Sequence, residues 1–202
     1  MVDLFTYVVR YDIGFAPNPF HGFCTLATCK PGIRRTAKPG DWIAGVGSRQ
    51  KGQDGLLVFA MRVDDAISYD AYWSDPKFER KKPNRAGSLK QRYGDNIYHR
   101  SPDGESWFQE DSRHSLADGT PNTDHVRRDT SAPRVLISQT FAYYGDQAVD
   151  IPAEFRNWAG LDICSGGRGY RRHFPDDLRN AFLKWLEPQG GERIVGEPLD
   201  WR

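Results

Sequence analysis

The residues with the most versatile chemistry in this chain are three cysteines and five histidines. Cys29 lies close in sequence to His21, and further histidines follow between residues 99 and 125. A thiol or a hydroxyl beside an imidazole acts as a nucleophile, and Asp12 is a candidate third member of such a set. Spacing along the chain selects none of these combinations, because catalytic sets are defined by geometry in the fold and not by sequence order.

Metal and cofactor chemistry find less support in the spacing. Cys24 and Cys29 have four residues between them, but no second ligand pair follows, and structural zinc sites are built from two such pairs. If residues 23–29 form a strand, the two thiols point to opposite faces. No Gly-x-Ser-x-Gly turn and no phosphate loop with Gly-Lys-Ser/Thr is found. The sequence therefore predicts neither a metal nor a cofactor.

A glycine-containing strand is the clearest candidate for a ligand-facing element. Residues 38–41 (KPGD) are typical of a turn. Two strands are expected after it, at Trp42–Gly47 and at 56–63, with a polar turn between them. Small residues in a strand leave room for another group to approach the backbone. We expect this ribbon to form the ligand side of a small barrel.

The charge of the chain is strongly segregated although its formal net charge is only +1. Basic residues gather at 77–100 and near 168–172, and acidic residues gather at 101–118. Aromatic residues interleave with the basic ones at 69–82, a pattern that suits phosphate neutralisation and base stacking, although a solvated loop of mixed charge explains it as well. The residues expected to contact a nucleic-acid backbone are Lys77, Arg80, Lys81, Lys82, Arg168, Arg171 and Arg172.

Length and composition indicate one folded domain. The chain has 202 residues, and its 13% aromatic content argues against disorder. Short strands precede one strongly amphipathic helix at 175–187, which indicates an α+β fold, while 76–130 is a long loop-rich segment. No apolar run is long enough to span a membrane, no signal peptide is visible, and the odd number of cysteines favours a reducing, cytoplasmic location.

Residues 7–48, with the runs DIGFAPNP and CKPGIR, resemble the nucleotide modification associated domain family, type 2. The resemblance continues through residues 56–78 and 135–145, so it covers most of the chain. The Gly-Asp-Trp strand is similar to the wider PUA-like superfamily, which includes the EVE, YTH and ASCH domains. The resemblance implies an α+β, PUA-like mixed β-barrel with short flanking helices. We expect residues 1–202 to form a single domain with a long basic and acidic insertion at about 76–130.

From the residues themselves, we expect a pocket between the loop 12–20 and the strand 42–48. Asp12 accepts from a base amino or imino group, Asn18 reads an amide-like edge, and Phe15 and Trp42 stack on the base. The alternative is that the two aromatic residues belong to the core and that Asp12 and Asn18 only tie the loop. The expected base-binding or nucleotide-binding residues are Asp12, Phe15, Asn18, Lys30, Arg34, Trp42 and Ser48, with Lys30 and Arg34 on flanking phosphates.

The favoured function is recognition of a modified base in DNA or RNA, linked to nucleotide modification or defence. One alternative is an enzyme on a modified base or nucleotide that uses Asp12, Cys29, Lys30 or a loop histidine. A protein-interaction module is the other. Because no catalytic motif is visible, the sequence places the reader of modified bases ahead of the enzyme. The sequence does not indicate which modified base is bound, whether it is carried by DNA or by RNA, or the oligomeric state of the protein.

Overall fold

The computed structural model describes residues 2–164, 169–189, 191 and 193–201. The chain divides into two compact units. Unit 1 comprises Met1–Asp12, Ala37–Asp64 and Ser138–Arg202, and unit 2 comprises Ile13–Thr36 and Asp65–Ile137. The expectation of a single domain over 1–202 stays a prediction.

Unit 1 is built on a six-stranded mixed sheet in the order β1-β3-β4-β9-β11, with β10 paired to β4. The outer strands are parallel to their neighbours, β1 to β3 and β11 to β9, and the β3–β4 and β4–β9 pairs are antiparallel. The bounds are β1 Leu4–Val9, β3 Trp42–Gly47, β4 Leu56–Arg62, β9 Thr140–Tyr143, β10 Val149–Asp150 and β11 Arg193–Ile194.

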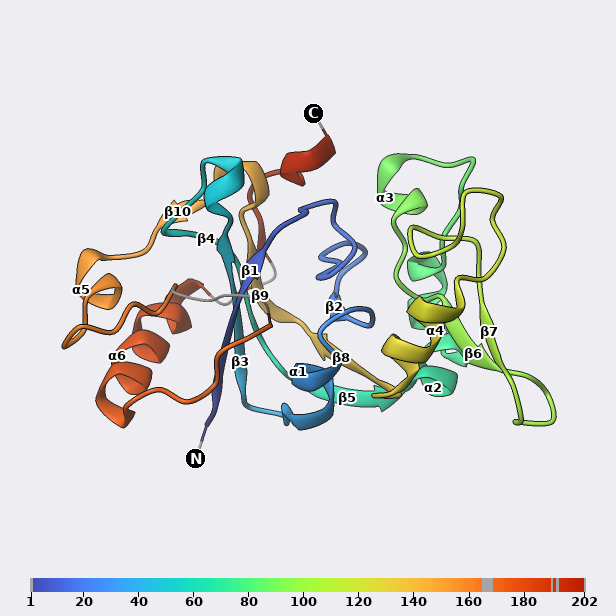
Figure 1. Cartoon of the computed structure of the whole chain (residues 1–202), viewed down its shortest axis with the longest axis horizontal. Coiled ribbons are helices and arrows are strands. Elements are labelled where there is room, and N and C mark those ends of the chain that lie inside the picture. Colours follow the sequence, from blue (N-terminus) through green and yellow to red (C-terminus); the bar gives the residue numbers. More distant parts are fainter. Residues whose placement is uncertain (1, 165–168, 190, 192, 202) are drawn as a thin grey trace. The chain divides into compact units, whose positions relative to one another are not determined.

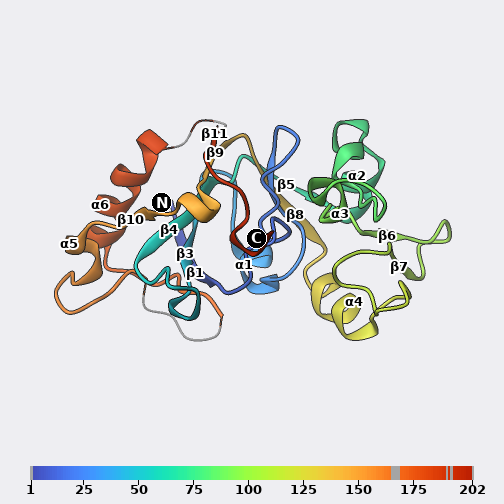
Figure 2. The ribbon, with the colours of Figure 1, turned by 90° about the horizontal axis from the view of Figure 1, so that it is seen from above.

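One face of this sheet is covered by α6 (Asp176–Leu186) and the short α5 (Ala153–Arg156), as Figures 1 and 2 show. Leu178, Phe182 and Leu186 follow helical spacing, and they pack in one core cluster with side chains of β1, β3 and β4. The helix expected at 175–187 is thus confirmed, with Pro175 at its N-cap. Short 3-10 turns at Arg49–Lys51, Gly145–Gln147, Glu187–Gln189 and Leu199–Trp201 complete unit 1.

The glycines of β3 have a different purpose from the one that the sequence suggested. A Cβ atom on Gly45 would lie 2.1 Å from the Phe59 ring, and one on Gly47 would lie 2.1 Å from the Gln53 carbonyl oxygen. Neither separation is possible between non-bonded atoms, so the space beside both glycines is filled by the protein itself. These two glycines allow close internal packing, and they leave no exposed backbone for a ligand.

Unit 2 combines a three-stranded sheet, a hairpin and short helices. The sheet has the order β2-β8-β5 with bounds Cys24–Leu26, Arg134–Ser138 and Asp65–Ser68, and the hairpin joins β6 (Tyr98–Arg100) to β7 (Trp107–Gln109). Its helices are α1 Pro31–Thr36, α2 Tyr69–Ser74, α3 Leu89–Arg92 and α4 Thr123–Thr130, with a 3-10 turn, η2, at Pro76–Lys81.

The segment 76–130 contains more regular structure than its composition indicated. It supplies η2, α3, the β6–β7 hairpin and α4, and its Phe78, Ile97 and Tyr98 are fully buried in the core of unit 2. The expected helix start at Ser68 is confirmed, because the Ser68 side chain accepts a hydrogen bond from the amide of Ala71. Buried anchors of this kind explain how a polar segment remains ordered.

The fold class is mixed α+β, as expected from the sequence, with several sheets and mostly short helices. Within the residues described, the strands form open sheets and no closed barrel, so the PUA-like barrel is not confirmed. Among the described residues, no helix has the length and apolar character needed to cross a membrane.

Candidate functional site

Cys29 occupies a strained turn between β2 and α1 in unit 2. Its φ is 57° and that of Lys30 is 39°, both in the left-handed region that residues with a side chain rarely adopt. Such a conformation costs on the order of 1 kcal/mol or more at each residue, so the surrounding structure must impose it. Strain of this kind is concentrated at functional sites, which directs attention to the Cys29 side chain.

Arg34 is the residue that holds this turn in place. Its guanidinium is fully buried, and it donates to the carbonyl oxygens of Cys29 at 2.8 Å and Asp129 at 2.7 Å. Further bonds run to the carbonyl oxygens of Ala132 and, at 2.9 Å, Arg134. One side chain therefore connects the Cys29 turn to the end of α4 and the start of β8.

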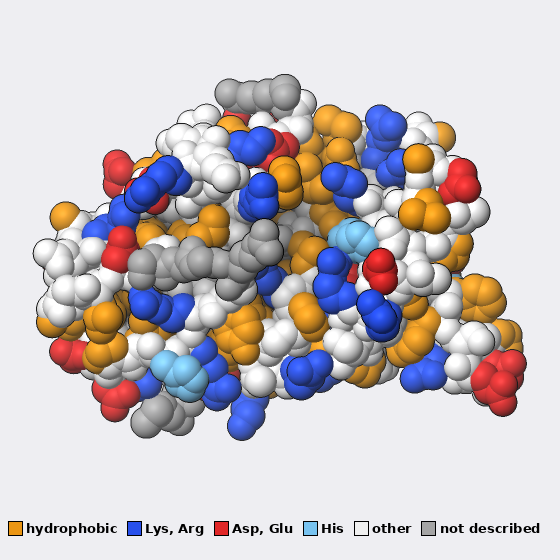
Figure 3. Space-filling view, viewed as in Figure 1, with side chains coloured by type: hydrophobic (Ala, Val, Ile, Leu, Met, Phe, Trp, Pro, Cys, Tyr) orange, Lys and Arg blue, Asp and Glu red, His pale blue; other side chains and the backbone are white. Residues whose placement is uncertain are grey.

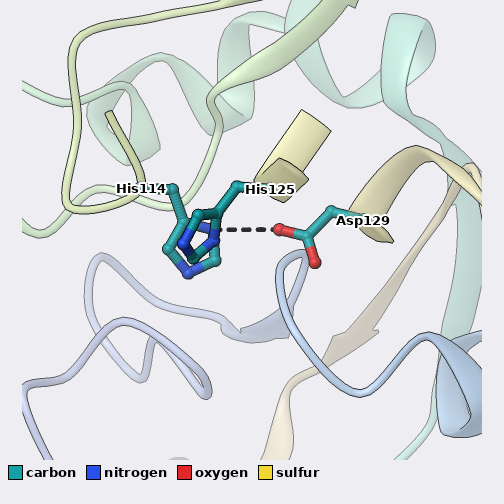
Figure 4. Close-up of side chains that lie close together, drawn as sticks. All are labelled: His114, His125 and Asp129. Carbon is teal, nitrogen blue, oxygen red and sulfur yellow. Dashed lines mark hydrogen bonds and ion pairs between the residues drawn. The ribbon is translucent and has the colours of Figure 1, made fainter. Parts of the chain in front are cut away.

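His114 connects the thiol of Cys29 to a buried carboxylate. Its Nε2 lies 3.6 Å from Sγ of Cys29. Its Nδ1 lies 2.9 Å from Oδ2 of Asp129, the contact that the dashed line in Figure 4 marks. Since the carboxylate accepts only, the hydrogen-bond network assigns the proton to Nδ1 and leaves the lone pair of Nε2 facing the thiol. This is the tautomer that accepts a proton from Cys29.

Asp129 lies on α4, and every hydrogen bond that its carboxylate accepts has a positioning role. Oδ1 accepts from the Cys29 amide at 3.0 Å, and Oδ2 accepts from the Tyr98 hydroxyl at 3.0 Å in addition to His114. The side chain has no exposed surface. A buried carboxylate needs this number of donors, because an unpaired charge in the interior is very costly.

The electrostatics of the site favour an ion pair between a protonated His114 and the carboxylate of Asp129. Burial alone would lower the pKa of His114, but its hydrogen bonds to Asp129 and to the Cys29 sulfur, and the negative charges of both groups, raise it above the ordinary value. Burial would raise the pKa of Asp129, but the hydrogen bond and charge of His114, with Arg34 and Arg128, hold it below the ordinary value. The pair therefore stabilises a positive charge on His114 when that ring takes a proton.

A second histidine, His125, lies against His114, with ring centroids 4.0 Å apart (Figure 4). Its spacing of four residues from Asp129 on α4 places both side chains on the same side of the helix. His114, His125 and Asp129 each offer one ligand atom within 4.8 Å of the others, so a metal ion is a candidate occupant.

The surroundings of Asp129 do not fit that occupant. Both carboxylate oxygens already accept hydrogen bonds, and the guanidinium groups of Arg34 and Arg128 lie 4.0 and 3.5 Å from Oδ1. A divalent cation would have to displace these donors and approach two fixed positive charges. The geometry fits proton transfer between Cys29 and His114 better than metal coordination.

The other two cysteines differ from Cys29 in environment. Cys24 and Cys164 are buried, and burial raises the pKa of each thiol to about 12. Cys29 is half-buried and lies beside the imidazole of His114. Because the thiolate is the nucleophile, Cys29 is the cysteine equipped for reaction.

The residues expected in a base pocket fall in both units. In unit 1, Trp42 belongs to the core cluster, and Ser48 is buried beside a 3-10 turn. Asp12 is buried and accepts from the Tyr143 hydroxyl and, at 3.1 Å, from the Leu199 amide. These contacts match the alternative in which the residues stabilise the fold, and a role in base binding stays a prediction.

In unit 2, Phe15 is buried and lies edge-on to His114, with ring centroids 4.8 Å apart. Asn18 is fully buried, and its amide donates to the carbonyls of Gly14 and Tyr93. Lys30 is half-buried, and burial lowers its pKa. The hydrogen bonds of Asn18 and of the buried Arg34 to protein carbonyl oxygens do not favour contact with a ligand. Base contact by Asn18 and phosphate contact by Arg34 stay predictions.

The expected phosphate-binding residues divide in the same way. Lys77 and Arg80 are exposed and Lys82 is half-buried, but Lys81 is fully buried and donates to Asn18 and Phe23. In unit 1, Arg171 donates to the Asp162 carbonyl and Arg172 pairs with Asp3. Arg168 lies outside the described residues.

The surface charge is mixed. Figure 3 shows that, within each unit, Lys and Arg side chains lie among acidic, apolar and uncharged ones. A strong electrostatic field over one face is the usual footprint of phosphate tracking. Contact with a nucleic-acid backbone therefore stays a prediction for the exposed members of the set.

The sequence offers Cys29 and the histidines of 99–125 as candidates, but nothing in their spacing selects His114, and Asp129 is not among those candidates. The available signal was the spacing of four between His125 and Asp129, after an Asn122 that caps the helix. That signal is informative only once 123–130 is recognised as a helix.

A family model described as nucleotide modification associated domain 2 matches residues 1–202 of the chain. No curated protein and no solved structure matches the chain.

Proposed function

Since the chain belongs to the nucleotide modification associated domain 2 family, we propose that it is an enzyme of nucleotide modification with Cys29 as its nucleophile. The observation that carries the proposal is the alignment of Cys29, His114 and Asp129, with separations of 3.6 and 2.9 Å. A thiol, an imidazole and a carboxylate in this order are the parts of nucleophilic acyl transfer. The proposed reaction is transfer or hydrolysis of an acyl group carried by a nucleotide.

Each residue has a defined task in this reaction. Nε2 of His114 takes the proton of the Cys29 thiol, and the sulfur attacks the carbonyl carbon of the acyl group. The imidazolium then gives its proton to the departing nitrogen or oxygen of the nucleotide, which leaves a thioester on Cys29. Water, activated by the same ring nitrogen, cleaves the thioester and restores the thiol. One water is consumed and no electrons are exchanged.

Asp129 acts through its neighbours. By accepting from Nδ1 it fixes the ring of His114 in the productive tautomer and stabilises the imidazolium that forms. By accepting from the Cys29 amide it also fixes the backbone that carries the sulfur. Arg34 makes the same backbone rigid from the other side.

An activated ester tests the proposed chemistry without knowledge of the natural substrate. With p-nitrophenyl acetate, the protein should release a burst of about one nitrophenolate per chain and carry an acetyl group on Cys29. Cys29→Ala should abolish the burst, and the matched variant Cys24→Ala should retain it. A release rate unaffected by Cys29→Ala would overturn the assignment of the nucleophile.

Nucleotides with an acylated base amino group or an acylated sugar hydroxyl test the proposed substrate class. Release of the acyl group should depend on Cys29 and His114. If the burst with the ester occurs but acylated nucleotides and acylated oligonucleotides are left intact, the nucleophile stands and the substrate class is wrong.

Recognition of a modified base in DNA or RNA is the second candidate function, and one observation favours it. Trp73 and His99 stack with centroids 4.2 Å apart, and Phe108 continues the column at 5.2 Å from His99. Phe108 is 48% exposed, so its ring offers a surface for a further stacked base.

Affinity measurements with modified and unmodified oligonucleotides separate the two functions. A reader should lose about 1–3 kcal/mol of binding free energy on Phe108→Ala, and Cys29→Ala should leave its binding unchanged. Equal binding of the Phe108→Ala variant and the parent protein would remove the support for this candidate.

A further inference from the structure

A cavity of about 270 Å³ lies in unit 2, and none of its lining residues is assigned to catalysis. It is lined by His21, by Glu79 and Arg80 of η2, and by Lys82, Asn84 and Gln91 of the segment that follows. Its volume is several times the ~30 Å³ share of one water in the liquid and below the ~300–1,000 Å³ of pockets for drug-sized ligands. A small polar group, together with part of the molecule that carries it, matches this volume.

The two amides of the cavity present donors. Oδ1 of Asn84 accepts from the Ala86 amide at 3.1 Å, and Oε1 of Gln91 accepts from the Ser88 amide at 3.0 Å. Because a backbone amide only donates, these bonds fix which end of each side-chain amide is the oxygen. Among the described residues, no protein acceptor receives a hydrogen bond from the side-chain NH₂ group of Asn84 or of Gln91.

Arg80 differs from its basic neighbours. Lys77 pairs with Asp75, Lys82 pairs with Glu79 at 2.6 Å, and the described residues supply no ion pair or hydrogen bond to the Arg80 guanidinium. The only carboxylate of the lining is therefore already neutralised, while a guanidinium with five donors remains available.

His21 adds a polar atom that the protein leaves unsatisfied. Its Nε2 is buried and has no hydrogen-bond partner, although polar atoms in an interior are nearly always paired. Its φ of 63° is left-handed, so the backbone is held in an unfavourable conformation with the ring against the cavity. Burial, together with the charges of Arg80, Lys81 and Lys90, lowers the pKa of His21 to about 4.

We propose that this cavity binds a phosphate group through Arg80, His21 and the amides of Asn84 and Gln91, while Lys82 keeps Glu79 neutralised. The lining has many donors and its one carboxylate is paired, which selects an anion with several acceptor oxygens and excludes a cation or an amine. A neutral His21 donates from Nε2 to such an oxygen. The proposal stands apart from the catalytic one, because none of its residues belongs to the Cys29 site.

Titration with inorganic phosphate, followed by NMR of the histidine resonances, tests the site directly. Phosphate should shift the His21 signals and raise the pKa of His21, because an anion stabilises the protonated ring. Arg80→Gln should weaken binding about tenfold or more, as expected for loss of charge-assisted hydrogen bonds. The matched control is Lys77→Gln, a change on the same 3-10 turn to an exposed lysine outside the cavity lining.

Two results would overturn the site. One is absence of any His21 shift with phosphate up to about 10 mM, and the other is equal weakening by Arg80→Gln and Lys77→Gln. Cys29→Ala should leave phosphate binding intact, so failure here and failure of the catalytic proposal are distinguishable. Comparison of a 5′-nucleoside monophosphate with an oligonucleotide, each with and without its 5′-phosphate, then identifies which source the cavity accepts.

Discussion

The amide of Cys29 donates a hydrogen bond of 3.0 Å to the carboxylate of Asp129, a residue 100 positions further along the chain. The other oxygen of that carboxylate accepts from His114, whose ring faces the Cys29 sulfur. One buried side chain therefore positions both partners of the proton transfer. Displacement of Asp129 should therefore disturb the thiol of Cys29 and the imidazole of His114 together.

Native-state alkylation should modify Cys29 selectively. Iodoacetamide at neutral pH is expected to label Cys29 and to spare the buried Cys24 and Cys164 until the protein is unfolded. His114→Gln removes the proton acceptor, so the labelling rate should fall about tenfold or more. Peptide mass spectrometry against time gives the rates.

Unfolded samples provide the control for this experiment, since all three cysteines should then react at similar rates in each variant. Faster labelling of Cys24 than of Cys29 in the native protein, or an unchanged rate in His114→Gln, would contradict the assignment.

Asp129→Asn should lower both stability and reactivity. An amide in that position presents NH₂ to groups that themselves donate, and it removes the charge opposite Arg34. We expect a loss of about 3 kcal/mol in the free energy of unfolding, measured in urea. Tyr98→Phe is the matched variant: it removes the hydroxyl that donates to the same carboxylate and accepts from Gln109, should cost about 2 kcal/mol, and should leave the Cys29 labelling rate near that of the parent. Equal labelling rates in all three proteins would exclude a positioning role for Asp129.

Local elements could be predicted from the sequence because their signals are local. The strand Trp42–Gly47 follows a turn, α2 begins after the cap residue Ser68, and α6 carries its apolar residues at helical spacing. The segment 76–130 was harder, because its structure depends on buried contacts of Phe78 and Tyr98 and not on its average composition.

The site could be predicted only in part. Cys29 and His114 are visible as reactive residue types, but their pairing with Asp129 depends on α4 and on the Arg34 bonds, which join residues about a hundred positions apart. Gly45 shows the opposite difficulty: a small residue in a strand is compatible with ligand access or with a close neighbour, and only the position of Phe59 decides between them.

Lys81 should be essential for stability, whereas the sequence alone suggested a surface role. Its ammonium is fully buried and donates to Asn18 Oδ1 at 2.8 Å and to the Phe23 carbonyl at 2.7 Å. Lys81→Ala removes these bonds and the positive charge that acts on the buried Asp95, and it should cost about 3–5 kcal/mol in urea unfolding. Lys77→Ala, on the same 3-10 turn but exposed, should leave the free energy of unfolding nearly unchanged. Similar stability of the two variants would show that Lys81 is solvated.

Gly45→Ala should be destabilising in spite of its small size. The new Cβ would lie 2.1 Å from the Phe59 ring, so the ring or the strand has to move, which costs about 1–3 kcal/mol. Phe59→Leu combined with Gly45→Ala should recover part of this loss relative to the sum of the single changes, as a double-mutant cycle measures. Strict additivity of the two changes would exclude the contact as the cause.

His114 and His125 should make opposite contributions to the pH dependence of the free energy of unfolding. The folded-state pKa of His114 is raised, so its contribution is complete below about pH 6.5 and is lost as pH rises through the folded value. The pKa of His125 is lowered to about 4, first by burial and then by the charge of His114, so its contribution is complete above about pH 6.5 and is lost as pH falls toward 4.

Urea unfolding from pH 4 to 9 should therefore show that His114→Gln removes a loss of stability on the alkaline side, and His125→Gln removes one on the acid side. The coupling adds a sharper test, because the charge of His114 is one cause of the lowered pKa of its neighbour. In His114→Gln, the pKa of His125 measured by NMR should rise toward its ordinary value of about 6.5. If the His125 pKa is the same in both proteins, the rings do not interact as their 4.0 Å centroid separation indicates, and the electrostatic account of the Cys29 site fails with it.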